Sequence, residues 1–83
     1  MDEKYGSEVR QRRLALDLTQ VQLARAIGRS QAWVAQLENL QLPASETNKR
    51  RIEAFLRERE RRVMRELRAV RRAMPRRAER VAP

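Results

Sequence analysis

Hydrophobic residues between positions 19 and 39 recur at three- and four-residue steps in two short blocks. The first block comprises Val21, Leu23, Ala24 and Ile27. Thr19 can cap a helix over this block, and Gln22, three residues later, completes a capping box. Gly28 follows at the position where a helix-ending residue with positive φ would lie. The pattern predicts a short amphipathic helix that ends at a glycine turn.

The second block comprises Ala32, Trp33, Val34, Leu37 and Leu40. Ser30 can cap a helix over it. Val34 and Leu37 can close a small core with Ala24 and Ile27 of the first block. Two short helices joined by a tight turn that contains glycine form the helix-turn-helix pattern. We expect the rest of the chain to be organised around this pair.

The flanking residues predict two further helices. Ser7 can cap a first helix that runs to about Leu16, and its apolar or near-apolar positions are Val9, Arg13, Leu14 and Leu16. After the second block, Pro43 prevents the helix from continuing. Ser45 or Asn48 can then cap the next helix, which can dock on the core through Ile52, Phe55 and Leu56.

From about Asn48 to Met74 the chain has no proline or glycine, which predicts one helix about 40 Å long that ends at Pro75. An apolar seam with short heptad spacing runs along it, interrupted by Glu60, and comprises Leu56, Val63, Leu67, Val70 and Met74. Three interpretations remain open. The seam can form a homodimer, which we favour, or fold back onto the head. Alternatively, the arginines around it can bind DNA phosphates or an acidic partner.

These patterns divide the chain into four parts: a flexible arm (1–6), a helix-turn-helix domain (7–56), an extension of the last helix that carries the seam (57–75) and a basic disordered tail (76–83). A chain of 83 residues suits one small domain. The net charge of +9 is concentrated in residues 51–83, which hold twelve arginines and five glutamates. Such a surplus favours polyanionic partners but cannot specify a sequence.

Composition excludes several classes of function. The chain has no cysteine and no histidine, so a disulfide framework, a thiolate metal site and the commonest general base are all absent. We therefore expect neither an enzyme nor a cofactor. No apolar run is long enough to cross a bilayer, and the first residues are polar and acidic, unlike a signal peptide. These features predict a cytosolic protein.

A more specific signal lies in the residues of the two blocks: Thr19-Gln20, Leu23-Ala24, Ile27-Gly28, Ser30-Gln31, Val34 and Gln36-Leu37-Glu38-Asn39. At these positions, and over residues 7–56, the chain resembles the Cro and repressor helix-turn-helix family of lambdoid phages (the XRE type). The resemblance implies an all-α, lambda-repressor-like head and a bacterial or phage regulator. It also implies a buried bidentate ion pair between Arg13 and Glu38. The family often has glycine where this chain has Leu40.

The candidate DNA contacts lie on and beside the second helix of the motif. Because Val34 and Leu37 point inward, Gln31, Ala32, Gln36 and part of Trp33 should face the major groove. A glutamine amide can pair with an adenine edge, and an alanine can meet a thymine methyl group. Trp33 can instead turn sideways and cover the neighbouring helix or a partner subunit. The predicted phosphate contacts are Gln20, Arg29, Ser30 and Asn39, with that of Gln20 implied by the resemblance.

The sequence thus predicts a repressor-like head followed by a long basic helix, and a regulator that binds double-stranded DNA in a sequence-specific manner as a homodimer. The main alternative keeps the head as a scaffold and uses the long helix to bind another protein, as an antitoxin or a phage regulator would. The small net charge of residues 1–50, with eight basic and six acidic residues, leaves that alternative open.

Overall fold

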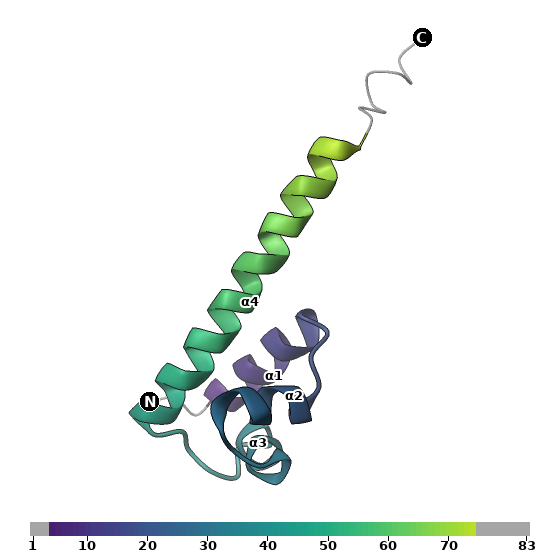
Figure 1. Cartoon of the computed structure of the whole chain (residues 1–83). Coiled ribbons are helices and arrows are strands. Elements are labelled where there is room, and N and C mark those ends of the chain that lie inside the picture. Colours follow the sequence, from purple (N-terminus) through teal and green to yellow (C-terminus); the bar gives the residue numbers. More distant parts are fainter. Residues whose placement is uncertain (1–3, 75–83) are drawn as a thin grey trace.

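The computed structural model describes residues 4–74. They form four helices: α1 (Tyr5–Ala15), α2 (Gln20–Ile27), α3 (Gln31–Glu38) and α4 (Glu46–Ala73). None of these residues lies in a β-strand, so the predicted all-α fold is confirmed. Helices α1 to α3 and the first half of α4 form a small head, and the second half of α4 projects from it as a rod (Figure 1). Residues 1–3 of the predicted arm and the tail 76–83 lie outside the described part.

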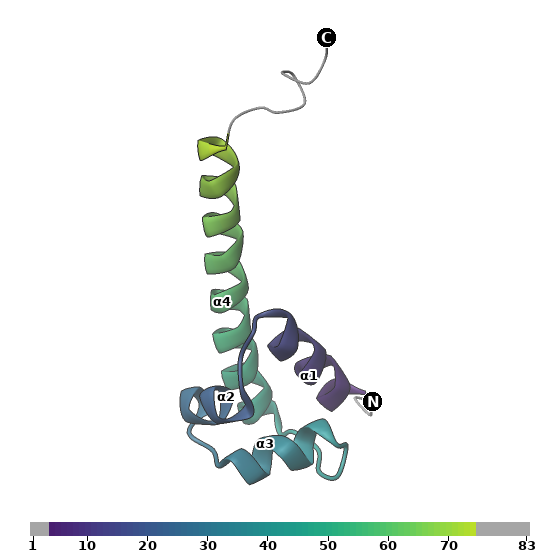
Figure 2. The same cartoon turned by 90° about the vertical axis from the view of Figure 1, so that its right-hand side faces the viewer.

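One hydrophobic core joins all four helices, and it comprises Val9, Leu18, Leu23, Ala24, Ile27, Val34, Leu37, Ile52 and Leu56. The predicted contact between the two blocks is therefore confirmed, and α2 and α3 are neighbours (Figure 2). Two of the apolar positions named above lie outside this core. Leu14 is 51% exposed and Val21 is 37% exposed, because each lies on the outward side of its helix. No helix among residues 4–74 could cross a membrane.

Helix α1 begins at Tyr5, earlier than the predicted start at Ser7, and no side chain caps it. Residues 5 and 6 therefore belong to the fold rather than to an arm. The Tyr5 hydroxyl donates to Glu53 of α4 at 2.8 Å, which fixes the first turn of α1. Gly6 is buried against the end of α3, where a Cβ would overlap the carbonyl oxygen of Leu37.

The first three helices all end in a left-handed residue, at Asp17 (φ 58°), Gly28 (φ 72°) and Leu40 (φ 61°). In each case the next amide donates to a carbonyl five residues back, as in a Schellman motif: Leu18 to Arg13, Arg29 to Ala24 and Gln41 to Gln36. Only Gly28 could be expected from its residue type. Leu40 keeps the turn that a glycine would favour, at a conformational cost of about 1 kcal/mol.

Helix α4 starts one residue after Ser45, whose hydroxyl accepts from the amide of Asn48 at 3.2 Å. Ser45 is therefore the cap, and Asn48 lies inside the helix. The helix ends at Ala73, with Met74 as its C-cap, slightly before the predicted end at Pro75. With 28 residues it is the longest element, and it gives the molecule dimensions of 58 × 21 × 20 Å.

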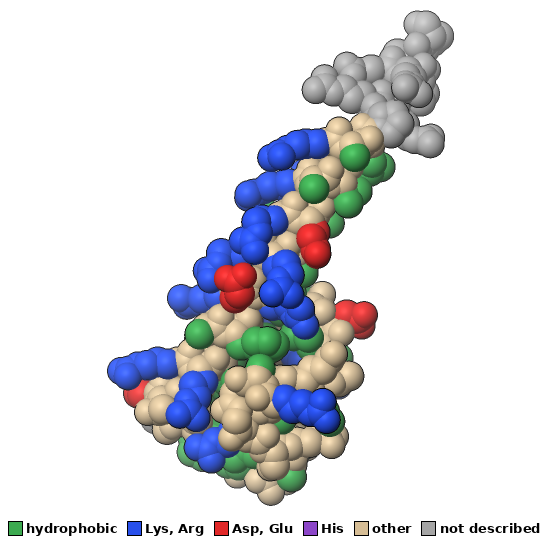
Figure 3. All heavy atoms as spheres, in the orientation of Figure 1, with side chains coloured by type: hydrophobic (Ala, Val, Ile, Leu, Met, Phe, Trp, Pro, Cys, Tyr) green, Lys and Arg blue, Asp and Glu red, His purple; other side chains and the backbone are tan. Residues whose placement is uncertain are grey.

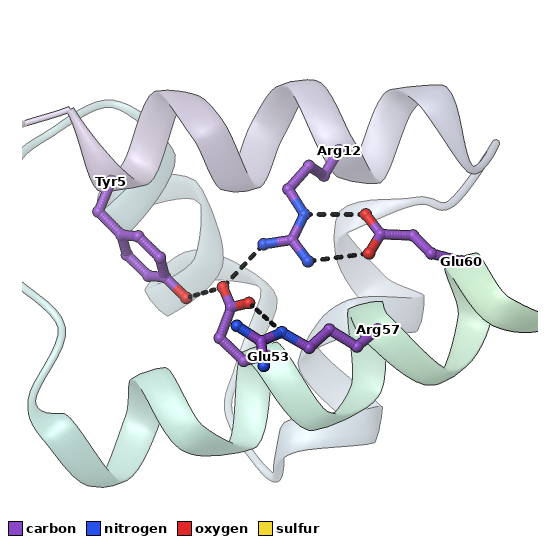
Figure 4. Close-up of polar contacts among 5 residues, drawn as sticks. All are labelled: Tyr5, Arg12, Glu53, Arg57 and Glu60. Atoms are coloured by element: carbon purple, nitrogen blue, oxygen red, sulfur yellow. Dashed lines mark hydrogen bonds and ion pairs between the residues drawn. The ribbon is translucent and has the colours of Figure 1, made fainter.

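A cluster of five polar residues, which we call the α1–α4 clamp, sets the direction of the long helix (Figure 4). It comprises Tyr5, Arg12, Glu53, Arg57 and Glu60. Arg12 donates to Glu53 at 2.7 Å and to both carboxylate oxygens of Glu60, at 2.9 and 3.0 Å. The hydrogen bonds from Arg12 lower the pKa of Glu60. Burial alone would raise the pKa of Glu53, but hydrogen bonds from Arg12 and Tyr5 outweigh it and lower that pKa.

The clamp corrects the predicted seam. Glu60 does not simply interrupt it, because Glu60 faces α1 and holds Arg12. Leu56 is fully buried in the core of the head and is not available to a partner. The exposed seam therefore starts at Val63, where α4 leaves the head, and its other predicted members, Leu67, Val70 and Met74, remain exposed.

Substitution of the two glycines should show which is needed for close packing (Gly6) and which for its backbone conformation (Gly28). Gly6→Ala should lower the free energy of unfolding by about 3 kcal/mol, because α1 must move away from α3. Gly28→Ala should cost only about 1 kcal/mol, because its positive φ is strained but nothing lies within 4 Å of a Cβ there. Urea unfolding measures both, and equal losses would contradict this account of Gly6.

Candidate nucleic-acid interface

Helix α3 lies at the end of the head that faces away from the rod (Figures 1 and 2). Its inner residues, Val34 and Leu37, are buried in the core. Gln31, Ala32 and Gln36 are exposed, so the three predicted base-contacting residues share the outer side of one helix. This side carries two amide groups, which are the kind of group that can pair with base edges in a major groove.

A buried ion pair holds the C-terminal end of α3 against α1. Arg13 donates through Nε to Glu38 Oε2 at 2.7 Å and through Nη2 to Glu38 Oε1 at 2.9 Å. The two side chains are only 7% and 1% exposed. The third donor, Nη1, reaches the carbonyl oxygen of Leu18 at 2.7 Å and so ties down the α1–α2 turn. The hydrogen bonds to Glu38 raise the pKa of the Arg13 guanidinium. The predicted bidentate pair is confirmed.

Gln20, in the first turn of α2, contacts both Glu38 and the first residue of α3. Its amide nitrogen donates to Glu38 Oε1 at 3.2 Å, and its amide oxygen accepts from Gln31 Nε2 at 3.5 Å. One side chain therefore touches both ends of α3. The bond to Gln31 is long, so Gln31 can leave it for a base at small cost.

The turn before α3 is held by a second set of contacts. The Ser30 hydroxyl accepts from the amide of Trp33 at 3.1 Å, which confirms Ser30 as the cap. The Arg29 guanidinium lies over the Trp33 ring, 5.4 Å from its centroid. Arg29 Nε also donates to Asn48 of α4 at 3.3 Å. Trp33 is thus packed partly against the core and partly under Arg29, which matches the sideways orientation better than a fully groove-facing one.

The four predicted phosphate contacts flank the outer side of α3, and most of them retain free donors. Gln20 has a second amide hydrogen, and Arg29 has two NH2 groups beyond its Nε bond. The Ser30 hydroxyl accepts from the backbone, so its own hydrogen is available to donate. Asn39 is exposed at the opposite end of α3, where it forms the C-cap.

The charges near α3 are sparse. Its eight residues carry one charged side chain, the buried Glu38. Figure 3 shows arginines along the rod and few charged side chains over the α3 end of the head on that side. The exposed groups of α3 itself are therefore amides and apolar side chains rather than arginines. The arginines that dominate the charge of the chain lie away from it.

Sequence reasoning found the buried pair but missed the polar links between the head and α4. The Arg29–Asn48 bond and the α1–α4 clamp were not predicted. One signal was present: Glu53 and Glu60 lie seven residues apart, on one side of the helix, and a basic residue opposite them could have been sought.

Residues 4–57, about two thirds of the chain, match the profile of a family described as Helix-turn-helix domain. The chain belongs to this helix-turn-helix family. The match starts just before α1 and ends at Arg57, so it covers the head, and the rod lies beyond it. Comparisons with curated proteins and with solved structures gave no significant match. Membership of this family indicates a DNA-binding regulator.

The buried pair should contribute strongly to the stability of the head. Arg13→Met should lower the free energy of unfolding by about 3 kcal/mol, because Glu38 would remain buried without its partner. Arg10→Met is the matched control, since Arg10 is exposed on the same helix. Urea unfolding of both variants is the measurement. If the Arg13 variant kept wild-type stability, the pair could not be what holds α3.

Proposed function

We propose that this helix-turn-helix protein is a transcriptional regulator of the XRE type that recognises a specific double-stranded DNA sequence, most simply as a repressor that occupies a promoter. The observation that supports this proposal is the outer side of α3: Gln31, Ala32 and Gln36 are exposed together while the C-terminal end of the helix is held by the buried Arg13–Glu38 pair. A rigidly held helix with two exposed amides suits base reading in the major groove.

In this proposal the roles divide along the interface. Gln31 and Gln36 pair with adenine edges, Ala32 contacts a thymine methyl group, and Trp33 packs on sugars at the rim. Phosphate contacts fix the position of the head on the duplex but carry no sequence information, and they fall to Gln20, Arg29, Ser30 and Asn39. The protein would act in the cytoplasm, with its DNA. The absence of histidine and cysteine favours a role without catalysis.

The predicted homodimer is constrained by the geometry of α4. Leu56 and Glu60 continue the line of the seam and contact the head, so the head lies on the same side of α4 as the seam. Packed helices lie about 8–10 Å apart, and a parallel second copy would therefore place its α4 where the first head lies. An antiparallel copy would put the two α3 helices at opposite ends. We therefore do not assign the seam to a dimer that places two heads on one operator, and the predicted homodimer stays a prediction.

The second candidate function, in which the rod binds another protein, is favoured by the exposure of the remaining seam. Val63, Leu67, Val70 and Met74 are 37–54% exposed on a helix that leads away from α3. A protein bound there would leave the reading helix free. We therefore propose one chain with two uses: a head that binds DNA and a rod that holds a protein.

Two single substitutions test the assigned roles in DNA binding. Gln31→Ala should weaken binding to the preferred sequence by about tenfold and leave binding to random DNA unchanged, because a base contact is lost. Arg29→Ala should weaken binding to both DNAs alike. It should also reduce the slope of log affinity against log salt concentration by the amount expected for about one phosphate contact. Fluorescence anisotropy with both duplexes, over a range of salt, measures these effects.

Gln11→Ala provides the control, because Gln11 is exposed on α1, away from α3. Thermal melting of each variant separates loss of contact from loss of fold. Equal losses on preferred and random DNA for Gln31→Ala would remove Gln31 from base reading.

A further inference from the structure

The rod carries a continuous apolar stripe that no part of the described chain covers. We call it the rod seam, and it comprises Val63, Leu67, Val70 and Met74, with Met64 beside it. Their exposed fractions run from 37% for Val63 to 54% for Val70. Figure 3 shows green side chains along one side of the rod and blue side chains along the other. An exposed stripe of this kind marks a surface that binds a partner.

Charge decides what kind of partner fits. The rod from Arg61 to Ala73 holds six arginines and one glutamate. Arg61 and Arg65 pair with Glu58. Within residues 4–74, the other four arginines form no ion pair: Arg62, Arg68, Arg71 and Arg72. A second copy would bring the same positive rod against this one, and like charges across an interface oppose association. An acidic partner would instead be attracted by this surplus, most strongly by the arginines that lie nearest the seam.

The arginines are also distributed unequally around the seam. At 100° per residue, Arg71 and Met64 border one edge, with Arg68 behind them, whereas Glu66 and Ala73 border the other, with Arg62 behind them. On the basic edge lies an open depression of about 550 Å³, lined by Arg57, Glu60, Arg61, Met64, Arg65 and Arg68. Four of its six lining residues are arginines, so it suits carboxylates that approach beside the apolar stripe.

We propose that the rod seam binds an acidic amphipathic α-helix of another protein. Its apolar side packs on Val63, Leu67, Val70 and Met74, and its carboxylates lie over the arginine-lined depression. This inference names the partner chemistry of the second use proposed above and rests on that use, but not on DNA binding by the head. Because α3 lies at the opposite end of the molecule, DNA and this partner can be held at once (Figure 2).

The size of the rod seam limits the affinity that we expect for the partner helix. Twelve residues of helix span about 18 Å, and the contact is smaller than a stable interface of about 1,600 Å². We therefore expect a transient complex with a dissociation constant on the order of micromolar, weakened by salt.

The test uses designed helical peptides of about 20 residues with leucines at heptad positions. One peptide carries glutamates beside the leucines, and a second carries lysines at the same places. Fluorescence anisotropy with the full chain at about 0.15 M salt measures binding. The glutamate peptide should bind at least about tenfold more tightly than the lysine peptide. Equal affinities, or no binding of the glutamate peptide, would overturn the proposal.

Variants of the chain locate the site. The double substitution Leu67→Ser with Val70→Ser should lower the affinity for the glutamate peptide by at least about tenfold. The variant should still fold, because both residues are half exposed. Leu14→Ser, an equally exposed leucine on α1, should change nothing. Arg68→Gln with Arg71→Gln should weaken binding and reduce its salt dependence, with Arg10→Gln as the control. Peptide binding unchanged by the seam or arginine variants would also overturn the proposal.

Sedimentation of the chain alone separates this partner from a second copy. We expect a monomer, and a dimer that the Leu67→Ser and Val70→Ser variant disrupts would instead assign the seam to self-association. The seam variants should bind DNA as the wild type does. If the peptide did not bind, the proposed DNA recognition by the head would still stand. If DNA did not bind, the result on peptide binding to the rod seam would still stand.

Discussion

The buried ion pair between Arg13 and Glu38 is the contact on which the architecture of the head depends. One guanidinium joins three elements: it binds α3 through two bonds to Glu38 and holds the α1–α2 turn through the carbonyl oxygen of Leu18. A charge this deeply buried is costly unless it is fully paired. A shift of α1 relative to α3 would therefore be unfavourable, because it would leave Arg13 and Glu38 buried without their partners. Gln20 adds a donor to Glu38, and its amide oxygen accepts a long, exposed bond from Gln31 at the other end of α3. The placement of α3 against α1 thus depends on one pair.

The α1–α4 clamp holds the long helix α4 in place against α1. Arg12 and Arg13 are adjacent in sequence but point to different partners, one to Glu53 and Glu60 of α4 and the other to Glu38 of α3. Helix α1 therefore fixes both the reading helix and the long helix. This arrangement places the exposed side of α3 and the rod seam at opposite ends of the molecule, so neither surface covers the other (Figures 1 and 2).

Local rules predicted most of the head. The caps at Thr19 and Ser30 and the glycine turn at Gly28 depend on neighbours within a few residues, and the structure confirms them. Longer-range contacts were harder to foresee. Gly6 was assigned to an arm because nothing near it in sequence shows that α3 approaches so closely. Leu56 fits the heptad spacing of the seam equally well whether a partner or the head buries it, and the head does.

The central claim, that α3 reads a DNA sequence, is tested most directly by selecting bound duplexes from a random pool at near-physiological salt. The account predicts an enriched motif that a single head can cover, with adenines placed for the amides of α3. A pool that stays random after selection would show that only phosphate attraction remains, and it would contradict the claim that the exposed side of α3 is a reading surface.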